Sequence, residues 1–99
     1  MKLIYITCKD TEEAEKISKH LLRKRLIACA NIFPIKSMYL WEGKITDDNE
    51  VVLLAKGMDY ENIKKEVKKI HSYKIPCILK INVDGNSEYL NWVSNICKE

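Results

Sequence analysis

The sequence contains little glycine or proline and no long apolar run. Three Gly and two Pro among 99 residues exclude a linker or a fibrous chain. No apolar run approaches the roughly 20 residues that a membrane span needs. The start, MKLIYITCKD, is also too short to hold the apolar core of about 7–15 residues found in a secretory signal. We therefore expect a cytoplasmic protein with no membrane partner.

A strong charge of one sign and closely paired cysteines are also missing. Seventeen Lys and Arg against fourteen Asp and Glu give a net charge of +3. This charge is too small to indicate a dedicated nucleic-acid binder, so we expect no nucleic-acid partner. The four cysteines include no C-x-x-C pair, which excludes the usual zinc and redox spacings. We expect them to be free thiols.

Apolar residues make up 46% of the chain, enough to form the core of a single domain over residues 1–99. Hydrophobic periodicity predicts strands at 2–8, 26–41, 51–56 and 78–83, and helices at 10–25, 59–70 and 87–96. Asp10 and Glu13 match a capping box at the start of the first helix. Pro34 predicts a break or bulge in the long second strand, and residues 47–49 predict the turn that follows it.

This order predicts an α+β protein with a ferredoxin-like βαββαβ fold, an extended hairpin between the second and third strands, and an extra C-terminal helix. Two helices would cover one face of the sheet. The first strand is apolar on both faces, since Leu3 and Tyr5 alternate with Ile4 and Ile6. An uncovered apolar face normally marks an interface, so we predict a stable homo-oligomer. The alternative is that the C-terminal helix covers this face.

The sequence offers no arrangement that indicates catalysis, and we expect a protein that is not an enzyme. No Ser-His-Asp pattern or metalloprotease motif is present. An RNA-binding sheet would need exposed aromatic residues on its central strands, and only Tyr5 is available there. A soft-metal chaperone would need two thiolates after the first strand, where Cys8 stands alone.

Unusual side chains concentrate in the hairpin and in the loop before the last strand. Cys29, Trp41 and Lys44 belong to the hairpin, whereas His71 and Tyr73 belong to the loop. If these segments meet at a subunit boundary, Cys29, Trp41, Lys44 and Tyr73 are candidates for an inter-subunit ligand cleft. Packing between subunits would explain the same residues, because Trp and Tyr commonly anchor interfaces.

At these residues the sequence resembles the CutA family of divalent-cation tolerance proteins. The resemblance covers nearly the whole chain and is most specific in ACANIFP at 28–34, YLWEGK at 39–44, HSYKIP at 71–76 and YLNWV at 89–93. It implies a ferredoxin-like subunit, a tight homotrimer and a cytoplasmic location. It also implies a role in the response to metal ions, with binding of copper or another divalent cation. The family trimer is similar to the PII signalling proteins, which implies an alternative function. That alternative is a PII-like regulatory trimer that binds a small anion or a partner protein in its inter-subunit cleft.

The resemblance implies Cys8 and His71 as metal ligands. His71 matches the histidine of the family's H-P-Y-E-x-P segment, but Ile70 stands where some members have a second histidine. Lys74 replaces the usual acid, and Cys77 stands where an acid often follows the second proline. With fewer imidazole and carboxylate ligands, we expect Cu(2+) or another divalent cation to bind weakly.

Overall fold

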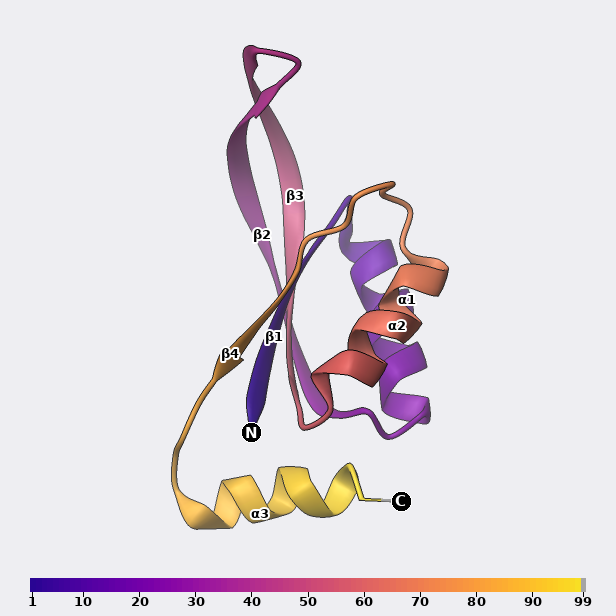
Figure 1. Cartoon of the computed structure of the whole chain (residues 1–99), viewed down its shortest axis with the longest axis vertical. Helices are drawn as coiled ribbons and strands as arrows, with labels where there is room; N and C mark the ends of the chain where they lie inside the picture. The colour runs from indigo at the N-terminus through magenta and orange to yellow at the C-terminus, as the bar shows by residue number, and fades with distance from the viewer. Residues whose placement is uncertain (99) are drawn as a thin grey trace.

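The computed structural model describes residues 1–98 and contains a single four-stranded sheet with three helices (Figure 1). The elements are β1 (Lys2–Cys8), α1 (Thr11–Arg23), β2 (Ile27–Trp41), β3 (Lys44–Gly57), α2 (Tyr60–Ile70), β4 (Ile78–Asn82) and α3 (Ser87–Ile96). The sheet order is β2-β3-β1-β4, and each neighbouring pair is antiparallel. This arrangement confirms the predicted α+β, ferredoxin-like βαββαβ fold with an extra C-terminal helix. Only Glu99 of the predicted domain lies outside the described residues.

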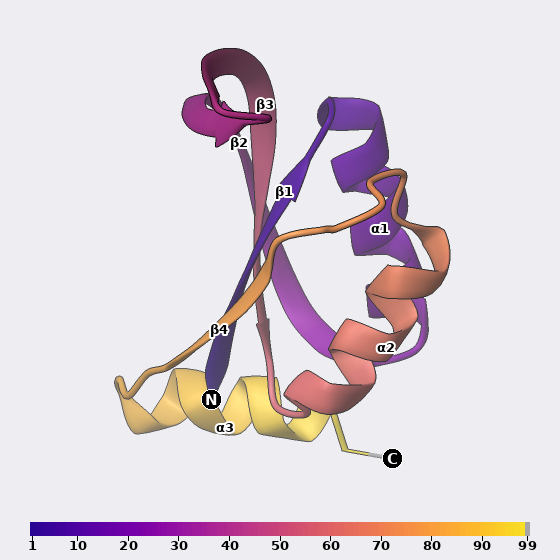
Figure 2. The same ribbon diagram turned by 45° about the horizontal axis from the view of Figure 1, so that its top comes forward.

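The β2–β3 hairpin is longer than the sequence indicated, and it extends well beyond the other strands (Figures 1 and 2). The turn predicted at residues 47–49 is wrong, because β3 pairs with β2 continuously from Lys44 onward. The chain reverses at Glu42 and Gly43, which both have positive φ, as a tight hairpin turn requires. The expected bulge at Pro34 is also wrong. Pro34 pairs with Val51 in regular register, and the edge position of β2 tolerates its missing N–H.

The main core lies between the sheet and the two helices α1 and α2. Ile4, Ile6 and Cys8 point from β1 into this layer and are fully buried there. They pack with the buried face of α1, which includes Ile17 and Leu21. Successive side chains of a strand point to opposite faces of the sheet, so Cys8 lies on the inner face with Ile4 and Ile6. It is at the end of β1 that faces the start of α1.

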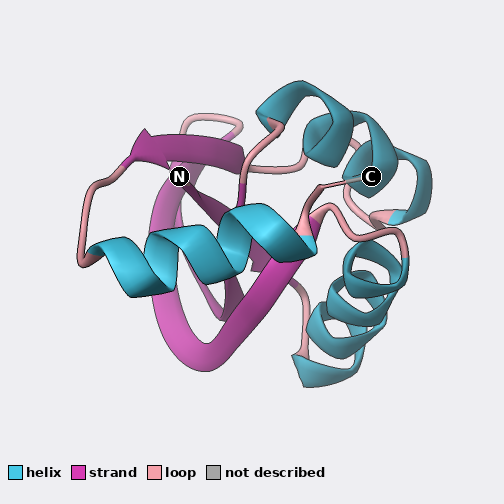
Figure 3. Cartoon of the chain, turned by 90° about the horizontal axis from the view of Figure 1, so that it is seen from below, coloured by secondary structure: helices cyan, strands magenta, loops and turns pink. Residues whose placement is uncertain are grey.

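The opposite face of the sheet is only partly covered. Helix α3 crosses one end of it (Figure 3). Val93 of this helix is buried, and the Lys56 ammonium lies 5.5 Å from the ring centroid of Tyr89. Farther along the same face, Leu79 is 55% exposed and Ile81 is 49% exposed. The C-terminal helix thus does not cover the whole face, which leaves an apolar surface open. No helix within residues 1–98 is long and apolar enough to cross a membrane.

Candidate functional site

Three potential metal ligands meet beside the loop that connects α2 to β4. Cys8 ends β1, Glu13 lies in the first turn of α1, and His71 follows α2 directly. One donor atom from each residue lies within 4.8 Å of the others. The structure therefore brings the two predicted ligands, Cys8 and His71, together within one subunit. It adds the carboxylate of Glu13, which the sequence pattern indicates only as part of a helix cap.

Both ring nitrogens of His71 already form hydrogen bonds. Nε2 lies 2.8 Å from the carbonyl oxygen of Thr7, which can only accept, so Nε2 carries the proton. The backbone N–H of Tyr73 donates to Nδ1 at 3.0 Å. The imidazole of His71 is fully buried. His71 is thus a neutral imidazole that ties the loop to the end of β1.

Glu13 is saturated in a similar way. Its two carboxylate oxygens accept hydrogen bonds from the backbone N–H groups of Lys9 and Ser72, at 2.9 and 2.8 Å. Asp10 accepts a hydrogen bond from the Glu13 N–H in turn, which confirms the predicted helix cap. Burial acts to raise the pKa of Glu13. The hydrogen bonds that Lys9 and Ser72 donate to the carboxylate outweigh burial, so the pKa of Glu13 is lowered overall.

The Cys8 thiol is held in its protonated form. Burial raises the pKa of Cys8 to about 12, and the negative charges of Glu13, Asp10 and Glu50 add to this effect. Metal ions bind the thiolate, so an incoming ion must displace this proton. It must also displace the Tyr73 N–H from His71 before Nδ1 becomes available. The thiol, imidazole and carboxylate suit a borderline divalent ion by type, but the cost of these displacements favours weak binding.

A groove of about 690 Å³ lies on the other side of the loop. We call it the aromatic groove; it is lined by Thr7, Tyr39, Leu40, Trp41, Thr46, Asp48, Glu50, Ser72, Tyr73, Lys74, Ile75 and Cys77. It therefore contains two of the four predicted cleft residues, Trp41 and Tyr73. Lys44 lies beside the hairpin turn, and Cys29 lies near α3, where Lys56 approaches its sulfur at 3.9 Å. One subunit alone does not bring these four residues together.

Two tyrosine hydroxyls bind two carboxylates in the aromatic groove. Tyr39 donates to Asp48 at 3.0 Å, and Tyr73 donates to Glu50 at 2.5 Å. The hydrogen bond to Asp48 raises the pKa of Tyr39. Burial raises the pKa of Tyr73, and the contact with Glu50 raises it further. Both phenols therefore remain protonated donors at neutral pH.

The sequence did not predict four residues of these sites: Glu13, Tyr39, Asp48 and Glu50. A sequence signal existed for the last two, because residues two apart on a strand point to the same face. It was hidden by the mistaken turn at 47–49, which removed both acids from a strand. Nothing in the sequence spacing indicated that Glu13 would face a loop 59 positions later.

Comparison with known proteins assigns this chain to a family. Residues 2–96 match the family described as CutA1 divalent ion tolerance protein. The chain belongs to this family. A divalent-cation tolerance protein CutA from Archaeoglobus fulgidus is 47% identical to this CutA1-family chain over 93 residues, which is 91% of each sequence. A protein of the same name from Pyrococcus horikoshii is 44% identical over 96 residues, or 94% of each sequence.

Solved structures agree with this assignment to the CutA1 family. The structure described as the periplasmic divalent cation tolerance protein CutA from Archaeoglobus fulgidus has a TM-score of 0.94 at 43% identity, covering 99% of this chain and 100% of its own. A PII-like protein CutA from Nostoc sp. PCC 7120 has a TM-score of 0.90 at 28% identity, covering 99% of this chain and 98% of its own. The cytoplasmic location predicted from the sequence stays a prediction, since the Archaeoglobus protein is described as periplasmic.

Proposed function

We propose that this CutA1-family protein is a cytoplasmic, non-enzymatic homotrimer that contributes to metal tolerance by weak binding of Cu(2+) or another divalent cation. The proposed ligands are Cys8 and His71, together with Glu13. The observation that carries the metal assignment is the convergence of a thiol, an imidazole and a carboxylate within 4.8 Å. Bound metal would use the donor types that borderline divalent ions prefer.

Exposed apolar side chains on both faces of the sheet support the trimer. The sheet face beyond α3 is open at Leu79 and Ile81, and the hairpin presents Leu40 and Ile45 at 72% and 78% exposure. A two-stranded ribbon is only marginally stable in water without a covering layer. Contacts with further copies of the chain would bury both surfaces.

A charge on the open face tests the trimer. Leu79→Asp should convert the trimer to folded monomers, because Leu79 is already half exposed in the single subunit but would have to be buried in the assembly. Leu22→Asp is the matched control, since Leu22 is exposed on α1, on the helical side of the sheet. Sedimentation velocity at micromolar concentration gives the result. A parent protein that sediments as a folded monomer would contradict the trimer.

Anaerobic calorimetry with Zn(2+) and Cu(2+) tests the metal site. Cys8→Ser should weaken binding about tenfold or more, whereas Cys97→Ser should have no effect. Cys97 is a suitable control because it lies at the end of α3, away from the cluster. Its thiol donates to the carbonyl oxygen of Leu26. His20→Ala is a second control, since His20 bonds to Glu66 between the two outer helices. Unchanged binding by Cys8→Ser would remove Cys8 from the site.

The PII-like alternative gains support from the aromatic groove, where the predicted cleft residues Trp41 and Tyr73 meet. In this second candidate function, the trimer binds a small ligand in the groove and metal binding is incidental. The two functions are separable, because Cys8→Ser changes the metal cluster and does not alter the tyrosine-bound carboxylates of the groove.

A further inference from the structure

The aromatic groove contains two carboxylates that lack a cationic partner. Tyr39 binds one oxygen of Asp48, and Tyr73 binds one oxygen of Glu50. Neither carboxylate forms an ion pair with a residue of the described part of the chain, 1–98. Each therefore keeps an oxygen available to a donor that enters the groove. By contrast, the neighbouring Asp47 pairs with Lys36 at 3.8 Å.

The electrostatic potential around this groove is set by carboxylates. Glu50 raises the pKa of Tyr73 and also that of Cys77, in both cases after burial as the larger cause. Lys74 lines the groove as well, but two carboxylates against one ammonium leave a net negative charge. A small anion, the ligand expected for a PII-like cleft, would be repelled here.

The remaining walls suit the apolar part of a cation. Tyr39, Trp41 and Tyr73 supply aromatic rings, whose faces attract positive charge. Because the hydroxyl groups of both tyrosines already donate to the carboxylates, the rings are held in place before a ligand arrives. A volume of about 690 Å³ is in the range of small-molecule sites.

We infer that the aromatic groove binds an organic cation, with its ammonium group at Asp48 and Glu50. The apolar body of this ligand lies against Tyr39, Trp41 and Tyr73. The inference rests on the second candidate function, because it names the ligand class for the same groove. It is independent of metal binding at Cys8.

Three probes that share one ring test the charge preference. Benzylammonium, benzyl alcohol and benzoate carry charges of +1, 0 and −1 on nearly the same framework. The reporter is the indole N–H signal of Trp41, observed by NMR in a Trp92→Phe background so that it is the sole indole. We expect millimolar binding of benzylammonium, about tenfold weaker binding of benzyl alcohol, and no shift with benzoate.

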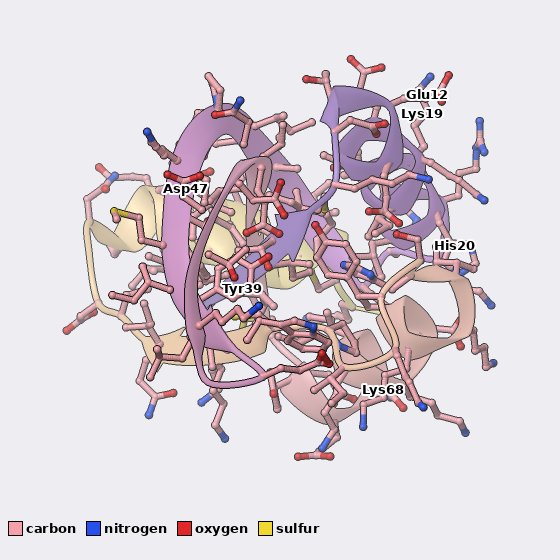
Figure 4. The ribbon with its side chains drawn as sticks, turned by 90° about the horizontal axis from the view of Figure 1, so that it is seen from above. Glu12, Lys19, His20, Tyr39, Asp47 and Lys68 are labelled. Carbon is pink, nitrogen blue, oxygen red and sulfur yellow. The ribbon has the colours of Figure 1, made fainter. Side chains whose placement is uncertain are left out.

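Variants of adjacent residues supply the matched control. Glu50→Gln and Asp48→Asn should each weaken benzylammonium binding about fivefold, because each removes a charge and keeps an oxygen for its tyrosine. Asp47→Asn removes the same charge one position away. Its side chain points to the opposite face of β3, and it should leave the affinity unchanged. In Figure 4, Tyr39 and Asp47 are labelled on the hairpin, and His20 and Lys68 are labelled on the helical side.

Several results would overturn the inference. Equal binding of benzylammonium and benzyl alcohol would reveal a purely apolar groove. Tighter binding of benzoate would indicate an anion site. Displacement of benzylammonium by Mg(2+), beyond that caused by NaCl at equal ionic strength, would make a metal ion the better occupant. No shift with any probe would mean that another copy of the chain fills the groove. Cys8→Ser should leave every groove result unchanged, so a failure of the metal proposal would be recognised separately.

Discussion

The loop at residues 71–77 separates two clusters of polar side chains that have opposite characters. On one side, the Cys8–Glu13–His71 cluster is buried, and backbone groups satisfy both Glu13 oxygens and both His71 nitrogens. Within residues 1–98, no buried side-chain nitrogen or oxygen lacks a partner. On the other side, the aromatic groove is open, and among residues 1–98 only tyrosine hydroxyls donate hydrogen bonds to the carboxylates of Asp48 and Glu50.

This difference separates stability from binding. Saturated buried groups hold a loop in place, because breaking any one of them leaves an unpaired partner inside the protein. Groups with free oxygens in a groove contribute less to folding and remain available to a ligand. Tyr73 connects the two clusters, since its N–H binds His71 and its hydroxyl binds Glu50. Changes on the two sides should therefore have unequal effects on stability.

The largest effect is expected from His71→Ala. It removes the partner of the Thr7 carbonyl and of the Tyr73 N–H, and it leaves a cavity where a fully buried ring stood. We expect the free energy of unfolding to fall by about 3 kcal/mol. Tyr73→Phe removes only the hydroxyl bond to Glu50 and should cost about 1 kcal/mol. Urea unfolding at fixed protein concentration measures the free energy of unfolding of both variants. Equal losses would contradict the expected difference in stability between the buried cluster and the groove.

A smaller effect, with a characteristic pH dependence, is expected from Glu13→Gln. The amide cannot accept both backbone hydrogen bonds, so the variant should lose about 2 kcal/mol at pH 7. The folded pKa of Glu13 is lowered from 4.5, so its carboxylate stabilises the fold above that pH. This contribution is lost as the pH falls through the lower folded value.

The difference between parent and Glu13→Gln should therefore shrink below about pH 4.5. Glu50→Gln is the matched control on the groove side, because glutamine can still accept the Tyr73 hydroxyl. Its effect should stay below about 1 kcal/mol. Urea unfolding across the acid range follows both variants. A Glu13→Gln deficit that stays constant from pH 7 to pH 3 would show that the charge of Glu13 does not stabilise the loop.

Sequence periodicity was sufficient for the fold but not for the two clusters. The order of strands and helices could be predicted because each has its own apolar spacing, and the open sheet face followed from Leu3 and Tyr5 alternating with Ile4 and Ile6. The clusters depend on contacts between distant segments. Glu13 meets Ser72, and Tyr73 meets Glu50, only after the sheet has formed.

Naming a candidate residue did not predict its chemistry. Cys8 and His71 were named through family resemblance, and the structure places them together. Their protonation could not be foreseen, since it depends on burial and on hydrogen bonds to backbone groups. The hairpin shows the converse failure. Turn-forming residues at 47–49 suggested a loop, but pairing with β2 keeps them in a strand.

The smallest effect is expected in the reactivity of Cys77, which lines the groove. The thiolate is the reactive form, and burial followed by the charge of Glu50 raises the pKa of this thiol. Glu50→Gln removes the second cause, so alkylation of Cys77 by iodoacetamide at pH 8 should accelerate about two- to threefold. Mass spectrometry of individual peptides measures the rate. Cys8 should stay nearly unreacted in the same samples, because it is fully buried and its pKa is about 12.

Asp47→Asn again distinguishes the local effect of the Glu50 charge from the effect of the protein's net charge. It changes the net charge of the protein by the same amount, but its side chain lies on the other face of the hairpin and pairs with Lys36. Cys77 should therefore react at the parent rate in this variant. If both variants accelerate the reaction equally, the carboxylates act through the overall charge of the hairpin. In that case the groove has no local negative potential of its own, and its preference for a cation would lose its physical basis.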